Sequence, residues 1–151
     1  MNWLAVIIGC VYFSWIDIKE RRIPNRTVII MLVIRIVLLA YELVTDANNW
    51  NRIIEGMCYG AAAGAAVMLV ARLFSKEGVG MGDVKLFGVI GAYIGLGQIF
   101  SVMLYAFLYS AIIGIVLIFI KKLKLKDSLP MAPFALAGLV TVLFINLIWR
   151  Y

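Results

Sequence analysis

Two aspartates, Asp17 and Asp83, lie at the ends of apolar runs, where a charged side chain is energetically unfavourable. Asp17 follows 16 uncharged residues, a run shorter than the roughly 20 that a helix needs to cross a bilayer. Asp83 precedes a second short apolar stretch, which starts at Val84. An ionisable residue at membrane depth is expensive and indicates function by default. If two such carboxylates approach each other, one keeps its proton and can act as a general acid. The other stays ionised and can act as a general base that takes a proton from water. This is the chemistry of an aspartic protease.

The composition indicates that the solvent of this chain is a lipid bilayer. Of its 151 residues, 65% are hydrophobic and only 15% are charged, whereas a soluble domain is about half apolar and a quarter charged. The net charge of +6 would suit nucleic acid, but the basic residues gather in short segments between apolar runs, as the positive-inside rule predicts. We therefore expect an integral membrane protein with one domain, 1–151, and no nucleic-acid partner.

Six apolar runs come near the length of a membrane span, which predicts an all-α bundle of about six transmembrane helices. The runs are Asn2–Ile18, Thr27–Leu43, Ile53–Phe74, Val84–Gly97, Gln98–Ile120 and Pro130–Trp149. Only "GLGQ" separates the fourth run from the fifth, so five spans, with these two as one bent hairpin, is the alternative. In the third run, Gly56, Gly60 and Gly64 have the four-residue spacing that lets helices in lipid approach closely.

The charges of the connections predict how the helices are oriented. The first, third and fifth connections are basic and the second and fourth are not, which places the odd connections in the cytoplasm and both termini outside. Because two spans separate Asp17 from Asp83, the two acids are expected on the same, cytoplasmic, side of the membrane. No metal site is expected, since the chain has no histidine and its two cysteines form no CxxC pair.

The segment "EGVGMGDVKL" combines Asp83 with glycines that a substrate could approach. Gly80 and Gly82 allow unusual backbone dihedrals and close contact with an extended peptide. The plainer interpretation is a turn between helices in which Asp83 caps the fourth helix. Together with Asp17, the interpretation as an active site is the stronger one.

Three segments resemble a known family. "GMGDVKL" fits the GxGD motif of intramembrane aspartyl peptidases, "DIKERRIPN" resembles the first catalytic segment of the type IV prepilin peptidases, and "LPMAPFALAG" resembles their last-helix signature. The resemblance implies that Asp17 and Asp83 are the catalytic pair, without a cofactor, and that Gly80 and Gly82 shape the site. It also implies that a basic leader is cut from a prepilin-like substrate at the cytoplasmic face of the cell (inner) membrane. The chain resembles the short peptidases of tight-adherence (Flp-type) pilus systems, or of archaeal-like and competence pili. It is without the insert of paired CxxC motifs that accompanies methyltransferase activity in the longest family members.

Several neighbouring residues have more than one interpretation. Lys85 could tune the acid pair, form a local salt bridge, or extend to the lipid headgroups. Pro24 and Asn25 form the turn before the second helix, and the resemblance suggests that they also position Asp17. Arg35 falls within the second span, where it needs a partner or a cavity. Its candidate partners are Glu42, Asp17 and a substrate backbone.

Two functions of other classes compete with the peptidase. A small proton-coupled transporter would use Asp17 and Asp83 as a relay, and would show a polar stripe through several spans, to which only Arg35 contributes. An inactive pilus-assembly factor would have no need of both acids and their glycines. The residues leave open which aspartate is the acid and how many copies assemble.

Overall fold

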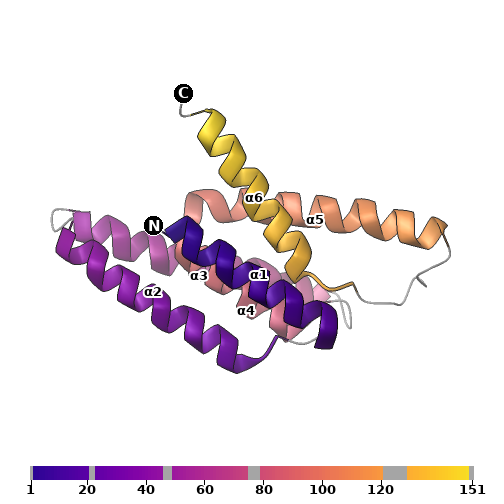
Figure 1. Cartoon of the computed structure of the whole chain (residues 1–151), viewed down its shortest axis with the longest axis horizontal. Helices are drawn as coiled ribbons and strands as arrows, with labels where there is room; N and C mark the ends of the chain where they lie inside the picture. The colour runs from indigo at the N-terminus through magenta and orange to yellow at the C-terminus, as the bar shows by residue number, and fades with distance from the viewer. Residues whose placement is uncertain (1, 21–22, 46–48, 75–78, 121–128, 150–151) are drawn as a thin grey trace.

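The chain folds into six α-helices within the residues that the structure describes (Figure 1). This computed structural model describes residues 2–20, 23–45, 49–74, 79–120 and 129–149. The helices are α1 (Asn2–Glu20), α2 (Asn25–Thr45), α3 (Trp50–Phe74), α4 (Met81–Ile94), α5 (Leu96–Phe119) and α6 (Ala132–Ile148). No strand occurs in these ranges, which confirms the predicted all-α class.

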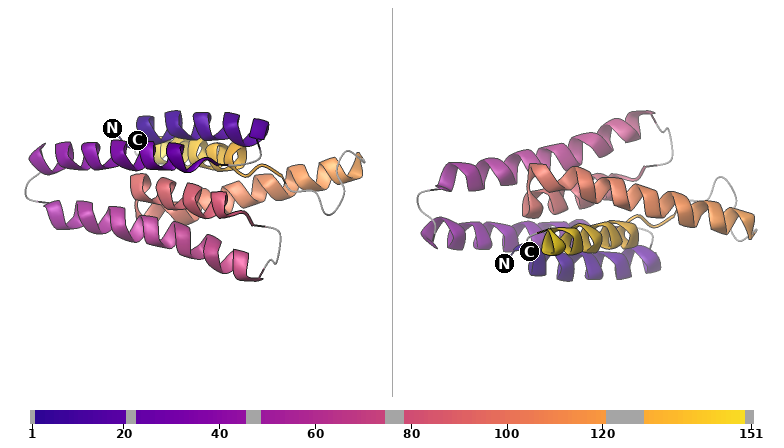
Figure 2. Two further views of the ribbon diagram at one scale, coloured as in Figure 1. Left: turned by 90° about the horizontal axis from the view of Figure 1, so that it is seen from below. Right: turned by 90° about the horizontal axis from the view of Figure 1, so that it is seen from above.

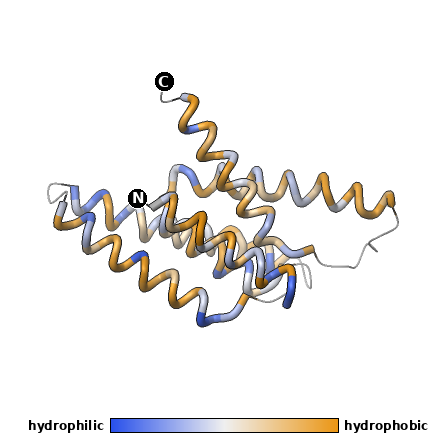
Figure 3. Tube along the Cα trace, in the orientation of Figure 1, coloured by the Kyte–Doolittle hydropathy of each residue, from blue (hydrophilic) through white to orange (hydrophobic). Residues whose placement is uncertain are grey.

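The surface of the described helices is that of a membrane protein. Three helices, α2, α3 and α5, are long and apolar enough to cross a membrane, and α6 is a shorter apolar helix. Large apolar side chains are exposed on nearly every helix, such as Phe74 at 87% and Phe119 at 83%, and Figure 3 shows the apolar colour along most of the trace. A water-facing surface of this kind would be unstable, so the chain is a multi-pass membrane protein. The sidedness of its termini stays a prediction.

A single glycine separates α4 from α5. Gly95 has a φ of 79°, a left-handed conformation that residues with a Cβ rarely adopt. Its backbone N–H donates to the carbonyl oxygen of Gly91 at 2.8 Å and so closes the last turn of α4. The two helices are therefore separate, as the six-helix plan predicts, although the break lies at Gly95 rather than after Gly97. α5 then runs out beyond the rest of the bundle (Figures 1 and 2).

Small residues bring α3 against α4. A Cβ added at Gly60 would collide with the backbone of Gly91, and one at Gly64 would collide with the carbonyl group of Phe87. The predicted close approach is confirmed at these two glycines. Gly56 does not take part, because a Cβ there would meet no atom within 4 Å.

The short helix α4 is the centre of the bundle, and it contacts all five other helices. Its side chains Leu86, Phe87 and Ile90 are completely buried, and in Figure 2 it lies among longer helices. Because apolar side chains fix α4 on every side, its first turn has a defined position, and that turn carries Asp83.

Candidate active site

Asp17 lies on the buried face of α1, near the end of that helix. Cys10, Phe13 and Asp17 follow one another at spacings of three and four residues and are all buried, so they share one side of the helix. The carboxylate of Asp17 is 6% exposed, and its Oδ2 accepts a hydrogen bond of 3.0 Å from the backbone N–H of Ala132. Ala132 is the first residue of α6, where backbone N–H groups have no partner within the helix. α6 therefore orients the carboxylate of Asp17.

Asp83 lies in the first turn of α4, just before the apolar stretch that starts at Val84. Gly80 is the N-cap residue of this helix, with an extended backbone. The backbone N–H of Gly80 donates to Oδ2 of Asp83 at 3.0 Å, and the backbone N–H of Asp83 donates back to the carbonyl oxygen of Gly80 at 3.1 Å. Asp83 thus caps α4, as the plainer interpretation predicts, but it does so from the third position of the helix, while Gly80 is the N-cap residue.

The carboxyl group of Asp83 has a raised pKa, to which Asp17 contributes. Asp83 lies outside the three helices that are long enough to span the membrane, and burial raises the pKa of Asp83 to about 6. The hydrogen bond from Gly80 opposes this rise in pKa, and the negative charge of Asp17 adds to it. Asp17 and Asp83 therefore lie at the same end of the bundle, as the count of intervening spans predicts. Neither forms an ion pair within the described residues.

The segment between α1 and α2 packs on the start of α4. The side chain of Ile23 is buried and fills the space beside Gly82, where an added Cβ would lie 3.2 Å from the Ile23 Cβ. Lys85 Nζ donates to Asn25 Oδ1 at 2.6 Å. Of the alternatives for Lys85, the structure therefore shows a local contact, but to an amide rather than to an acid. Pro24 forms the predicted turn, since its carbonyl oxygen accepts the N–H of Thr27 at 3.2 Å.

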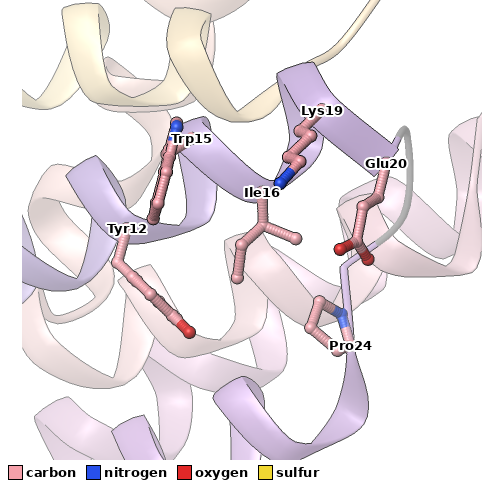
Figure 4. Close-up of a pocket in the computed structure, with 6 residues that line it drawn as sticks. All are labelled: Tyr12, Trp15, Ile16, Lys19, Glu20 and Pro24. Atoms are coloured by element: carbon pink, nitrogen blue, oxygen red, sulfur yellow. The ribbon is translucent and has the colours of Figure 1, made fainter.

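A cavity of about 350 Å³ lies beside the end of α1 (Figure 4). Aromatic and apolar side chains form most of its wall, and a lysine, a glutamate and a proline complete it. The residues are Tyr12, Trp15, Ile16, Lys19, Glu20 and Pro24. Neither aspartate lines this cavity, because Asp17 points into the bundle from α1.

Arg35 belongs to a separate polar centre. Its side chain is 4% exposed, and its Nη1 forms a salt bridge of 3.0 Å with Oε2 of Glu42. Its Nε donates to the carbonyl oxygen of Ala92, in the last turn of α4, at 2.8 Å. Of the partners considered for Arg35, Glu42 is confirmed and Asp17 is wrong.

Two contributors to the site were missed from the sequence. The "IPN" stretch drew attention to Pro24 and Asn25, but the contact between Ile23 and Gly82 joins two segments far apart in the chain. Ala132 acts through its backbone, which carries no signal of residue type. The only indication was Pro133 beside it, since proline is typical of the first turn of a helix.

The sequence matches a known protein family. The model of the type IV leader peptidase family matches residues 4–119. The chain belongs to the type IV leader peptidase family. The matched range includes both aspartates and the two segments that pack beside them, residues 23–25 and 80–85. Ala132 lies outside the matched range.

Several curated proteins with one shared name are similar in sequence to this chain. The prepilin leader peptidase/N-methyltransferase of Bacillus subtilis is 34% identical over 122 residues, which are 81% of this chain and 46% of that protein. The protein of that name from Xanthomonas campestris is 29% identical over 150 residues, 94% of this chain and 50% of the relative. The one from Stutzerimonas stutzeri is 28% identical over 147 residues, 93% of this chain and 48% of the relative. The chain thus spans about half the length of these relatives. No solved structure matches it.

Proposed function

We propose that this chain is an intramembrane aspartic endopeptidase that removes the basic leader peptide from a type IV prepilin-like protein. The six helices would act as one peptidase domain in the cell (inner) membrane, with the acid pair at the cytoplasmic face. The observation that carries the proposal is the pair itself. The buried Asp17 of α1 and the partly buried Asp83 of α4 belong to segments that contact each other at Ile23 and Gly82, and no cation of the described residues pairs with either acid. The charge of Asp17 also adds to the rise in the pKa of Asp83.

The pair has the parts that hydrolysis of a peptide bond requires. The ionised carboxylate takes a proton from a water molecule, whose oxygen bonds to the carbonyl carbon of the peptide. The protonated carboxyl group donates its proton toward the carbonyl oxygen, and the C–N bond breaks when the leaving nitrogen receives a proton. The products are a carboxylic acid and an amine, and one proton remains on the pair. Since the proton belongs to both residues, the proposal assigns no fixed acid or base.

The neighbouring residues would support substrate binding. Gly80 is exposed and extended, so a peptide could lie against its backbone close to Asp83 without meeting a side chain. Gly82 has no side chain, which leaves the space that Ile23 occupies. Lys85 donates a hydrogen bond to Asn25 and so ties the turn at Pro24 to α4. The relatives are prepilin leader peptidase/N-methyltransferases, and both aspartates lie in the range that the family model matches. The proposal carries over the peptidase activity alone.

The transporter has less support than the peptidase. Arg35 is the residue that a proton path through the spans would use, and its guanidinium group is occupied by Glu42 and Ala92. An inactive assembly factor would not explain why a buried and a partly buried carboxylate, each hydrogen-bonded to a backbone N–H, lie at one end of the bundle without a counter-ion.

The test is leader removal from a co-expressed prepilin-like protein, followed by the shift in its mobility on a gel. Asp17→Asn and Asp83→Asn should each abolish the shift, while the variant proteins remain in the membrane at the normal level. Glu42→Gln is the matched control, because it neutralises a partly buried acid of the other polar centre. It should lower stability but leave processing per folded molecule intact. Normal processing by either aspartate variant would refute the assignment.

A further inference from the structure

A two-point contact joins the segment between α1 and α2 to the first turns of α4. The first point is apolar, where the buried Ile23 lies so near Gly82 that an added Cβ would be only 3.2 Å from the Ile23 Cβ. The second is polar, the 2.6 Å hydrogen bond from Lys85 Nζ to Asn25 Oδ1. The residues of each pair are about sixty positions apart in the chain, so these contacts exist only in the folded protein.

The position of this contact relative to the acids is its most informative property. Ile23 and Asn25 follow Asp17 along the chain, and Gly82 and Lys85 flank Asp83. The hydrogen bonds of the acids themselves do not join them to each other. Asp17 is held by α6, and Asp83 is held by the start of its own helix. The two-point contact therefore connects the two acid-bearing parts of the chain directly.

Such a connection is needed because two like charges in a buried site repel each other. A catalytic pair must nonetheless be held to within about 0.5 Å of its productive geometry. Packing of α1 against α4 supplies part of this restraint. A lysine at the second point provides a charge-assisted hydrogen bond, which is stronger than one between neutral groups.

We propose that Ile23 and Gly82, together with Asn25 and Lys85, form a clamp that sets the separation of Asp17 and Asp83 for peptide hydrolysis. Lys85 is then a positioning residue, which acts through Asn25 and touches neither substrate nor lipid headgroup. This inference rests on the proposed peptidase function. It explains why a glycine, a lysine and an asparagine occur beside the acids without invoking a separate binding role for each.

The test is a double-mutant cycle on the polar arm, measured with purified protein in lipid vesicles and a prepilin-like substrate. Lys85→Met and Asn25→Leu should each lower kcat by about tenfold to a hundredfold, the range expected for misplaced catalytic groups, with KM nearly unchanged. The double variant should be no slower than the slower single variant, because both changes break the same contact. Lys85→Arg keeps the donor and Asn25→Asp keeps the acceptor of this hydrogen bond, and each should retain most of the rate.

Arg26→Met is the matched control, since it removes a cation from the residue next to Asn25 and should leave kcat within about twofold. Thermal unfolding of each variant shows whether it is folded, and a variant that does not fold is replaced by Lys85→Gln or Asn25→Ala. If the losses of the two single variants multiply in the double variant, or if Lys85→Met raises only KM, Lys85 contacts the substrate or the lipid and the clamp is wrong. Failure of the proposed function would look different, because Asp17→Asn would then cleave normally or the unaltered protein would not cleave.

Discussion

The two ends of α4 hold two buried polar centres with opposite electrostatics. At the carboxyl end, the positive charge of Arg35 is neutralised by Glu42, and a second donor of the guanidinium group satisfies the carbonyl oxygen of Ala92. The ring of Tyr93 lies 5.8 Å from the guanidinium carbon. At the amino end, about 14 Å away by the rise of an α-helix, Asp17 and Asp83 each accept a single backbone N–H and have no cation among the described residues.

The comparison suggests a criterion that separates ionisable residues with a structural role from those with a catalytic role, namely whether the charge has a counter-ion. A buried charge that is paired and hydrogen-bonded is compatible with a purely structural role. Arg35 fits this description, because it pairs with Glu42 and donates to the carbonyl oxygen of Ala92 in the last turn of α4. Two like charges without a counter-ion repel each other, and this repulsion opposes the benefit of their backbone hydrogen bonds. Their retention indicates chemistry, and the predictions below separate the two centres by stability and by activity.

The largest difference between the effect on activity and the effect on stability is expected for Asp83→Asn. Cleavage should fall by about a thousandfold or more, since general acid and base catalysis contribute about 10²–10⁴ in rate. The melting temperature should stay the same or rise, because the change removes a repulsive charge. Leader removal and thermal unfolding, both measured on the purified protein, check the two halves of the prediction. A fall in melting temperature that accounts for the lost activity would make Asp83 a structural residue.

The opposite pattern is expected for Arg35→Met. Breaking a buried ion pair by removing one partner costs about 3–5 kcal/mol, and the carbonyl oxygen of Ala92 would also lose its donor. Unfolding in detergent should show the loss of stability, while the cleavage rate per folded molecule stays within about threefold. Adding Glu42→Leu should recover part of the stability, because it removes the acid left without a partner. A large loss of cleavage in protein that is still folded would contradict the division between the two centres.

The acid pair should also give the activity its dependence on pH. Because the pKa of Asp83 is raised to about 6, and hydrolysis needs one proton on the pair, kcat should fall about tenfold per unit as the pH rises above that value. The same group affects stability. Its raised pKa means that the folded protein holds the proton more tightly than the unfolded chain.

The contribution of Asp83 to stability is therefore greatest below its ordinary pKa of 3.8 and is lost as the pH rises through about 6. Thermal unfolding between about pH 4 and pH 8 should show this trend, and Asp83→Asn should remove it. Arg35→Met, in contrast, should leave the alkaline limb of the cleavage profile in place. A profile that is flat across this range would show that no carboxyl of the site has a raised pKa.

The smallest effects on stability are expected for glycine substitutions in α3, where it packs against α4. Gly60→Ala should destabilise the protein by about 1–3 kcal/mol, because the added methyl group overpacks the contact with Gly91. Gly56→Ala is the matched control four residues earlier on the same helix, and there is free space beside Gly56. It should be neutral or stabilise the helix by up to about 1 kcal/mol. Equal effects of the two substitutions would contradict the close approach of α3 to α4.

The sequence was sufficient for the features that depend on apolar length and on counting. The apolar runs predicted six helices, and the two intervening spans correctly predicted that Asp17 and Asp83 share one end of the bundle. The spacing of Gly60 and Gly64 predicted a close helix contact. Each of these follows from a local pattern and one known dimension, the thickness of a bilayer.

The features that depend on contacts between distant segments could not be predicted. Ala132 contributes a backbone N–H, which every residue except proline has, so its hydrogen bond to Asp17 has no signature. The choice of Glu42 over Asp17 as the partner of Arg35 depends on the depth and rotation of α2 in the bundle. The alternative interpretation, in which Asp83 caps α4, is confirmed, but the helix begins two residues earlier, at Met81, with Gly80 as the N-cap residue.

The central claim is that Asp17 and Asp83 act as one catalytic unit. The most direct measurement is the initial rate of leader removal in lipid vesicles for the unaltered protein, Asp17→Asn, Asp83→Asn and the double variant. If the pair is one unit, each single variant loses at least about a thousandfold in rate, and the double variant is no slower than the singles. If either single variant keeps a substantial rate, or if the two losses multiply in the double variant, the carboxylates act separately and the claim is wrong.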